Sequence, residues 1–332
     1  MPCFNAADTI VRTFGSVFDQ TLTDFELLVV DDGSSDETPK VILDSARQNM
    51  RVQARLQVLS QENRGPGAAR NLGMSQGRGD LIAFLDADDV WSPEYLATVA
   101  GVFERFPQVD ALASNAWDVY PDGCHLALEP RNDTAFIIED YFKARLDRTI
   151  VVRTSGVTMR RSVASRVGYM REDLLRSQDT EYWARLAASG ICWGFSPEPL
   201  VFYDRVGARS LSRGLGWYIN VPSPEMWSRD IWPLLDSSMH ESFRKVYLRR
   251  AKGYCREYIR AGLDNEARTT AKEALSRATG CGNTLFFLAV RFGPSNLYRL
   301  VWRGGSWVKG LLRDTRRTLR ARRVRTTSPD RS

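Results

Sequence analysis

Two short apolar runs, each ending in aspartates, constrain the fold of this chain more than any other feature. Residues 25–30 (FELLVV) and 81–85 (LIAFL) have the length and composition of buried strands. Apolar residues at helical spacing over 7–19 precede the first run, and a segment of small residues over 65–77 separates the two. This alternation predicts an α/β domain with a mostly parallel sheet flanked by helices.

The rest of the chain divides by composition. Residues 111–119, 150–159 and 200–203 are predicted strands, residues 178–189 a helix, and the chain from about residue 237 is predicted helical. We therefore expect an α/β domain over residues 1–215, a connecting segment rich in Gly, Pro and Trp over 216–236, a helical C-terminal region over 237–312 and a basic tail over 313–332.

The chain opens with MPCFN, directly before the first predicted helix. A sheet of this type needs an apolar strand just before Pro2. We therefore expect the first strand to be truncated, either by a late translation start or by loss of the strand.

The positive charge is concentrated at the end of the chain. The net charge is +6, and the eight arginines and two aspartates of residues 313–332 account for all of it. Before this tail, basic residues alternate with apolar ones such as Trp302 and Trp307, a pattern typical of contact with an anionic membrane, although a solvated tail has the same composition. Nucleic-acid binding is not expected, because no base-reading motif accompanies the charge.

The longest apolar stretch without charge argues against a membrane span. It covers residues 278–290, which is 13 residues, whereas a transmembrane helix needs about 20. We expect a cytoplasmic protein that is at most peripheral at the inner face of the cell membrane.

Carboxylates gather where the two apolar runs end. Asp31 and Asp32 follow the first run, and Asp86, Asp88 and Asp89 follow the second. In open α/β sheets, ligands bind beyond the carboxyl ends of the strands. Such a cluster repels itself unless a cation or hydrogen-bond donors neutralise it, and Mg2+ or Mn2+ bound by carboxylates usually shares its shell with phosphates. The pattern predicts a divalent-ion site for a diphosphate; the alternative is a set of turn formers and helix caps.

Five segments in a fixed order carry a resemblance to a known family. They are PCFNA (2–6), VVDDGSSDET (29–38), ENRGPGAARNLG (62–73), FLDADD (84–89) and SQDTEYWARLAASG (177–190). Together they resemble the family 2 glycosyltransferases of the GT-A fold, of the bacterial cell-envelope polysaccharide type, over about residues 1–215. The resemblance implies a Rossmann-like sheet. It also implies an inverting enzyme that moves a sugar from a nucleoside-diphosphate sugar to a hydroxyl of a saccharide or lipid-linked acceptor.

The resemblance assigns nucleotide-binding roles to single residues. Pro2 and Phe4 would line the base pocket, and Asp32 would accept a hydrogen bond from the base ring N–H. Gly65 would let its loop approach the nucleotide, with Arg70 nearby.

The remaining implied roles concern the diphosphate and the acceptor. Asp86 would meet the ribose, Asp88 would ligate the metal ion, Mg2+ or Mn2+, and Asp179 would deprotonate the acceptor hydroxyl. The chain departs from the family pattern at Gln178, where a Glu is usual, and at Gly207, where a His is usual. The second departure puts the metal dependence in doubt.

Two other functions fit parts of the pattern. Asp86 could be the phosphate-accepting nucleophile of a magnesium-dependent phosphotransferase, but such enzymes usually carry a hydroxyl at the fifth position, where this chain has Val90. A truncated first strand and Gly207 would also suit a catalytically impaired nucleotide-sugar-binding protein. A covalent aspartyl phosphate would identify the first alternative, and donor binding without turnover the second.

Overall fold

The structure is a computed structural model that describes residues 1–47, 54–129, 134–206 and 223–292. By its contacts the chain divides into two units. The first contains the described residues of Met1–Pro222 and Met226–Val246, and the second those of Ser223–Glu225 and of the chain from Tyr247 onward.

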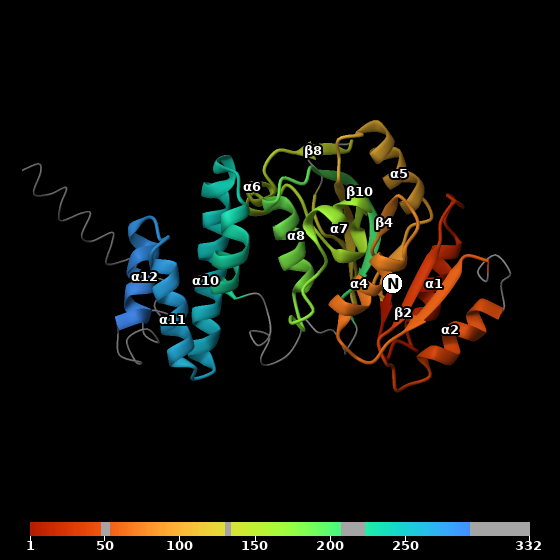
Figure 1. Cartoon of the computed structure of the whole chain (residues 1–332), viewed down its shortest axis with the longest axis horizontal. Helices are drawn as coiled ribbons and strands as arrows, with labels where there is room; N and C mark the ends of the chain where they lie inside the picture. Colours follow the sequence, from red (N-terminus) through yellow and green to blue (C-terminus); the bar gives the residue numbers. More distant parts are fainter. Residues whose placement is uncertain (48–53, 130–133, 207–222, 293–332) are drawn as a thin grey trace, which may run out of the picture. The chain divides into compact units, whose positions relative to one another are not determined.

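The first unit contains two sheets and the helices around them (Figure 1). Its strands are β1 (Pro2–Cys3), β2 (Leu27–Asp31), β3 (Leu56–Ser60), β4 (Leu81–Ala83), β5 (Val90–Trp91), β6 (Ala111–Tyr120), β7 (Gly123–Leu126), β8 (Phe136–Ile138), β9 (Val157–Arg160) and β10 (Trp193–Asp204). Its α-helices are α1 (Ile10–Phe18), α2 (Thr38–Arg47), α4 (Pro66–Gln76), α5 (Tyr95–Arg105), α6 (Tyr141–Leu146), α7 (Ser162–Val167) and α8 (Gln178–Ala188). Short turns of other helix types are η1 (Thr154–Gly156), η2 (Trp227–Ile231), η3 (Trp232–Leu234) and η4 (Ser237–Met239).

The smaller sheet is parallel, with the strand order β1-β2-β3. Its first strand has only two residues, but the pairing starts before it. The amino group of Met1 donates to the carbonyl of Leu28 at 2.8 Å, and the carbonyl of Met1 accepts from the amide of Val30 at 2.9 Å. Residues 1–3 therefore occupy the place that the sequence pattern leaves for a first strand, and Cys3 pairs with Asp31 at the carboxyl end of β2.

The larger sheet is mixed. Its order is β4-β9-β6-β10-β5, with β7 beside β6 and β8 beside β10. Only β6 and β10 pair in parallel among these described strands; the other pairs are antiparallel. Strand–helix alternation predicts more parallel pairing than this. The difference arises because antiparallel neighbours such as β6 and β7 are joined by a tight turn, here the Pro-Asp-Gly segment at 121–123, and need no crossover helix.

The predicted strand at residues 150–159 is wrong in its first part. The structure has the 3-10 turn η1 at Thr154–Gly156, and the strand β9 begins only at Val157. The backbone of Thr154–Gly156 is taken up by the turn, while the hydroxyls of Thr154 and Ser155 bind carboxylates of other segments.

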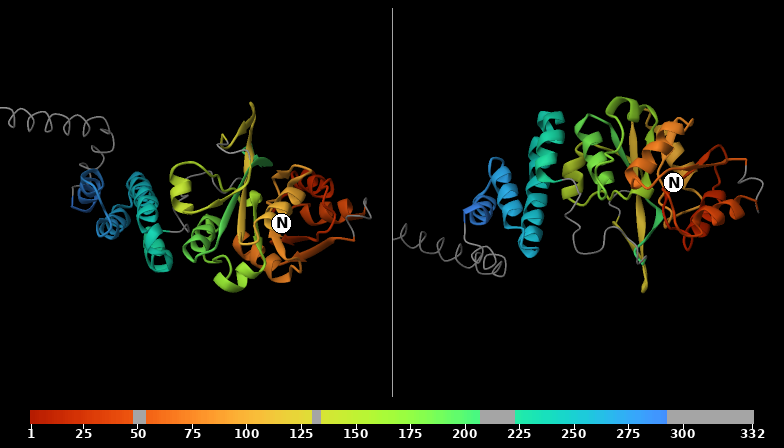
Figure 2. Two further views of the ribbon diagram at one scale, coloured as in Figure 1. Left: turned by 90° about the horizontal axis from the view of Figure 1, so that it is seen from above. Right: turned by 60° about the horizontal axis from the view of Figure 1, so that its bottom comes forward.

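Helices cover both faces of the larger sheet (Figure 2). Successive residues of a strand point to opposite faces, and β9 shows which helix lies on each. The hydroxyl of Thr158 pairs with that of Tyr95 in α5 at 3.0 Å, whereas Met159 lies against Tyr182 of α8. The core therefore has two layers, one on each face of the larger sheet. The buried aromatic side chains of α8 pack in one of these layers.

The second unit is helical in its described part. It contains the last part of α10 (His240–Arg260), together with α11 (Asp264–Leu275), α12 (Cys281–Phe292) and the start of α9 (Pro224–Met226). The side chains of Tyr247, Tyr254 and Cys255 on α10 and of Phe287 on α12 are buried. Within the described ranges, no helix combines the length and the apolarity that crossing a bilayer requires.

Two glycines of α4, in the first unit, offer a matched test of how closely this helix packs against its neighbours. A Cβ at Gly67 would lie 2.9 Å from the carbonyl oxygen of Arg171, whereas a Cβ at Gly73 would make an ordinary 3.6 Å contact with Val30. We expect Gly67→Ala to lower the free energy of unfolding by about 1–3 kcal/mol, because backbone must move. Gly73→Ala should raise it by about 0.5–1 kcal/mol, the usual gain inside a helix. Urea unfolding measures both; equal effects would contradict the close approach at Gly67.

Candidate active site

The aspartates that follow β2 organise the loops around them. Asp31 accepts from the amide and hydroxyl of Ser34, at 3.2 and 2.5 Å. Asp32 is buried. One of its oxygens accepts from the Gln61 side chain at 2.7 Å and from the Arg64 amide at 2.9 Å, and the other accepts from the Gly65 amide at 2.8 Å. Both oxygens of Asp32 thus hold the loop that leads into α4.

Gly65 is the residue at which this loop turns into α4. Its φ is +87°, in the left-handed region that favours glycine. One helical turn further on, α4 buries Arg70, whose side chain is 6% exposed. Its Nη2 lies 2.5 Å from a carboxylate oxygen of Asp86, while Nε and Nη1 have no hydrogen-bond partner among the described residues.

Arg70 also lies near a second carboxylate. Burial lowers the pKa of its guanidinium, but the negative charges of Asp86 and then Asp179 outweigh burial and raise it. The amino group of Met1 is within electrostatic reach of Asp86 and Arg70 as well; its pKa is lowered to about 6, mainly by burial. The residues expected at the ribose and at the acceptor therefore lie around one guanidinium.

The acidic segment after β4 is tightly packed. Asp89 is buried and accepts from the amide of Asp204 at 2.8 Å and from the hydroxyl of Ser155. Burial, followed by the charges of Asp88 and Asp86, raises the pKa of Asp89 well above its usual range. Burial and the charge of Asp86 likewise raise the pKa of Asp88, to about 6.

Arg12 of α1 also holds the acidic segment after β4 in place. Its guanidinium donates to the backbone carbonyl of Asp88 and to the carboxylate of Asp204, both at 2.7 Å. It does not hydrogen-bond the carboxylate of Asp88 itself in any contact that the described residues show. Of the three aspartates that follow β4, Asp88 is therefore the one whose side chain is least engaged by the chain.

Asp179 lies in the first turn of α8. One oxygen accepts from the amide of Thr180 at 2.6 Å, and the other accepts from the hydroxyl of Thr154 at 2.7 Å. The neighbouring Ser155 binds Asp89 and also accepts from the amide of Asp86 at 3.1 Å. The turn η1 thus connects the base candidate to the acidic segment after β4.

Two arginines enclose a tyrosine beside these acids. The guanidiniums of Arg153 and Arg205 lie 5.1 and 4.7 Å from the ring centre of Tyr203, and both pair with Asp118 at 3.0–3.1 Å. Burial and then the charges of Asp86 and Asp89 raise the pKa of Tyr203. Sequence reasoning missed Arg153, Asp118 and Tyr203, since they stand in no motif and meet only through β6, β10 and the residue before η1.

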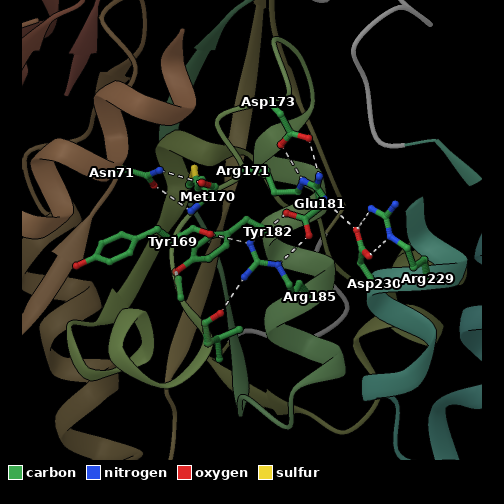
Figure 3. A network of polar contacts seen from close by, with 12 residues as sticks. Asn71, Tyr169, Met170, Arg171, Asp173, Glu181, Tyr182, Arg185, Arg229 and Asp230 are labelled. Carbon is green, nitrogen blue, oxygen red and sulfur yellow. Dashed lines mark hydrogen bonds and ion pairs between the residues drawn. The ribbon is translucent and has the colours of Figure 1, made fainter. Parts of the chain in front are cut away.

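The loop before α8 is fastened on several sides (Figure 3). Arg185 pairs with Glu181 on the same helix and donates to the carbonyls of Val167 and Tyr169 at 2.9 and 2.7 Å. Asn71 of α4 exchanges hydrogen bonds with the backbone of Met170 at 2.8 and 2.9 Å. These contacts hold the segment that leads into α8, and with it the position of Asp179.

The same loop is tied to η2 by a partly buried ion pair. Arg171 pairs with Asp230 at 2.5 Å and with both oxygens of Asp173, and Arg229 also binds Asp230 (Figure 3). The Arg171 side chain, first by its hydrogen bonds, holds the pKa of Asp173 below its usual range. The pKa of Asp230 is lowered in the same way, by Arg229 first and by Arg171.

The residues after β4 fit a divalent ion only in part. Within the described ranges no three His, Cys, Asp or Glu side chains are grouped as a complete metal site. Asp88 supplies one weakly engaged carboxylate among like charges, and Mg2+ or Mn2+ is commonly bound by one or two carboxylates plus phosphate oxygens. Gly207 lies outside the described residues, as does Arg209.

Other predicted site residues have these places. Pro2 lies in β1, and Phe4, which follows it, is 48% exposed. Gln178 is buried at the start of α8, and its Oε1 has no hydrogen-bond partner among the described residues. Arg70, Asp86, Asp88 and Asp179 lie in one neighbourhood, whereas Asp32 serves the loop before α4.

A parallel sheet with acidic residues beyond its strands, accompanied by a mixed sheet, defines an α/β protein, a class in which ligands bind beyond the carboxyl ends of the strands. The chain belongs to glycosyl transferase family 2, whose family model matches residues 1–168. The predicted family and fold class are thereby confirmed.

Curated relatives include proteins of bacterial polysaccharide synthesis. The chain is 43% identical over 98 residues to the succinoglycan biosynthesis protein ExoW of Rhizobium meliloti, a match that covers 29% of this chain and 30% of ExoW. It is 26% identical over 245 residues to the amylovoran biosynthesis glycosyltransferase AmsB of Erwinia amylovora, covering 70% of this chain and 79% of AmsB. The matched part thus spans less than a third of the length of ExoW.

Among solved structures, residues 1–349 of S. aureus TarS in complex with UDP superpose with a TM-score of 0.62. The match has 17% identity and covers 92% of this chain and 90% of that one. At this identity the likeness shows the fold.

The ion pair between Arg171 and Asp230 gives a prediction for this site. We expect Arg171→Met and Asp230→Asn each to lower the free energy of unfolding, and the double variant to lose about 1–2 kcal/mol less than the sum, because a charge-assisted hydrogen bond is lost only once. A double-mutant cycle by urea unfolding measures this coupling. Strict additivity would show that the pair does not fasten the loop to η2.

Proposed function

We propose that this chain is an inverting glycosyltransferase that moves a sugar from a nucleoside-diphosphate sugar to an acceptor hydroxyl, in the synthesis of a cell-envelope polysaccharide or glycolipid. The observation that carries the proposal is the placement of Asp86 and Asp179 around the buried Arg70. We assign this activity to the domain over residues 1–215, in which the matched family segment lies.

The family and the charges around Arg70 support a nucleoside-diphosphate sugar as the donor. TarS, which shares the fold, has been solved with UDP and with UDP-GlcNAc. In this chain Phe4 and Pro2 would line the base, Gly65 and Arg70 would approach the diphosphate, and Asp86 would meet the ribose. The two oxygens of Asp32 already accept three hydrogen bonds, so they have little capacity left to accept another from the base.

The transfer itself is one in-line displacement in this proposal. Asp179 takes the proton of the acceptor hydroxyl, and the acceptor oxygen forms a bond to the anomeric carbon. The bond between that carbon and the phosphate oxygen breaks, and the nucleoside diphosphate leaves with the electron pair. Thr154 keeps the Asp179 carboxylate in place through its 2.7 Å hydrogen bond.

Mg2+ or Mn2+ belongs to this proposal through Asp88. Such an ion would neutralise charge on the leaving diphosphate. The acceptor we propose is a saccharide or a lipid-linked saccharide at the inner face of the cell membrane. The tail expected to contact that membrane, residues 297–325, lies outside the described residues.

A specific contact opposes the phosphotransferase alternative, whereas a measurement decides on the binding-protein alternative. Asp86, the nucleophile of the phosphotransferase alternative, is engaged by Arg70, which opposes its use as a nucleophile. A binding protein without turnover would still bind donor, so turnover decides between it and the enzyme.

Asp179 provides the test of the acceptor side. We expect Asp179→Asn to bind the donor as the unchanged protein does but to lower kcat by about a hundredfold to ten-thousandfold, the usual contribution of a general base. Calorimetry measures donor binding, and release of nucleoside diphosphate measures turnover. Asp236→Asn, an exposed cap of η4, is the control. Unchanged turnover in Asp179→Asn would remove Asp179 from the proposed role.

Asp88 provides the test of the metal. With Mn2+ present, Asp88→Asn should weaken donor binding by about tenfold, because a ligand to the shared ion is lost. With the ion removed by a chelator, the variant and the unchanged protein should bind the donor alike. Circular dichroism confirms that the variant is folded. Equal binding in the presence of Mn2+ would exclude Asp88 as the metal ligand.

A further inference from the structure

The last described helix carries apolar side chains on its exposed face. On α12, Leu285, Leu288 and Phe292 are 46%, 39% and 68% exposed. Their spacing of three and four residues places them on one side of a helix with 3.6 residues per turn. Phe287 and Val290 on the opposite side are buried in the second unit. The exposed three form a stripe, which we call the α12 stripe.

Cations stand against the aromatic rings of the same helix. Lys252 and Arg256 of α10 lie 5.5 and 5.7 Å from the ring centre of Phe286, and Arg291 lies 5.0 Å from that of Phe292. Arg268 of α11 donates to the carbonyl of Arg291 at 2.8 Å, at the end of α12. Arg291 therefore lies beside the stripe, whereas Lys252 and Arg256 lie against Phe286 on a neighbouring side of α12.

Over the whole chain, the C-terminal part is basic and the part before it is acidic. Residues 1–246 carry 26 Lys and Arg against 34 Asp and Glu, whereas residues 247–292 carry nine against four. Residues 293–332 add eleven Lys and Arg against two Asp. The unit that bears the α12 stripe is thus positive, although the part of the chain that contains Asp86 and Asp179 is negative.

We infer that the α12 stripe docks on an anionic lipid surface. Apolar side chains with cations beside them are the combination that binds at such an interface, where the rings enter the headgroup region and the cations meet lipid phosphates. The same charges disfavour two other occupants: the C-terminal forty residues and the second unit of another copy are both positive. The inference rests on the membrane location in the proposed function, but on no step of the transfer.

The test uses the full chain and vesicle flotation. We expect binding to vesicles of phosphatidylcholine mixed with phosphatidylglycerol, weak binding to phosphatidylcholine alone, and loss of binding as salt is raised. The variant Leu285→Ser/Phe292→Ser should bind the mixed vesicles at least about tenfold more weakly, because apolar area no longer enters the interface. The control Leu43→Ser/Leu234→Ser changes two leucines of the first unit that are 50% and 43% exposed, and should bind as the unchanged chain does.

Three results would overturn the inference. They are equal binding by the Leu285→Ser/Phe292→Ser variant, equal binding to both kinds of vesicle, and a dimer that becomes a monomer in that variant, which would make a second copy the occupant. Circular dichroism checks the fold of both variants. Donor binding, measured separately by calorimetry, distinguishes the failures: its absence in the unchanged chain would refute the proposed function and leave the vesicle result standing.

Discussion

The acidic site depends on the partly buried ion pair between Arg70 and Asp86. Several carboxylates converge there, and burial of like charges is costly without a cation. Arg70 is in direct contact with Asp86 and within electrostatic reach of Asp179, so one guanidinium offsets charge from two segments that are far apart in sequence. Its Nε and Nη1, which have no hydrogen-bond partner among the residues that the structure describes, are donors of the kind that phosphate oxygens accept.

The short turn η1 holds the carboxylates around this ion pair in position. Thr154 binds Asp179, and Ser155 binds both Asp89 and the amide of Asp86. The carbonyl of Ser155 in turn accepts from the indole of Trp91 at 2.6 Å, within the core. The hydrogen bond to Trp91 thus anchors η1 to the core, and η1 in turn holds Asp179 and the segment of Asp86 and Asp89. A site in which two carboxylates act on one substrate needs such support.

Much of this arrangement could be predicted from the sequence, and the rest could not for physical reasons. Apolar runs that end in aspartates indicate buried strands and a ligand edge, and the start of α8 at Gln178 follows from helical periodicity. Thr154, Tyr203 and Arg153 carry no periodic signal, because their roles arise from tertiary contacts. The partners of Asp32 are backbone amides of residues 64 and 65, and backbone amides leave no trace in a sequence.

The departure at Gln178 follows from the same electrostatics. Its side chain is buried, and it lies close to Gly67 of α4. A glutamate there would bury another negative charge beside Asp179, near a site where Asp88 and Asp89 already have raised pKa values. The neutral amide keeps the size and a hydrogen-bonding group without that cost. Gln178 is therefore consistent with an acidic site whose negative charge is close to what Arg70 can offset.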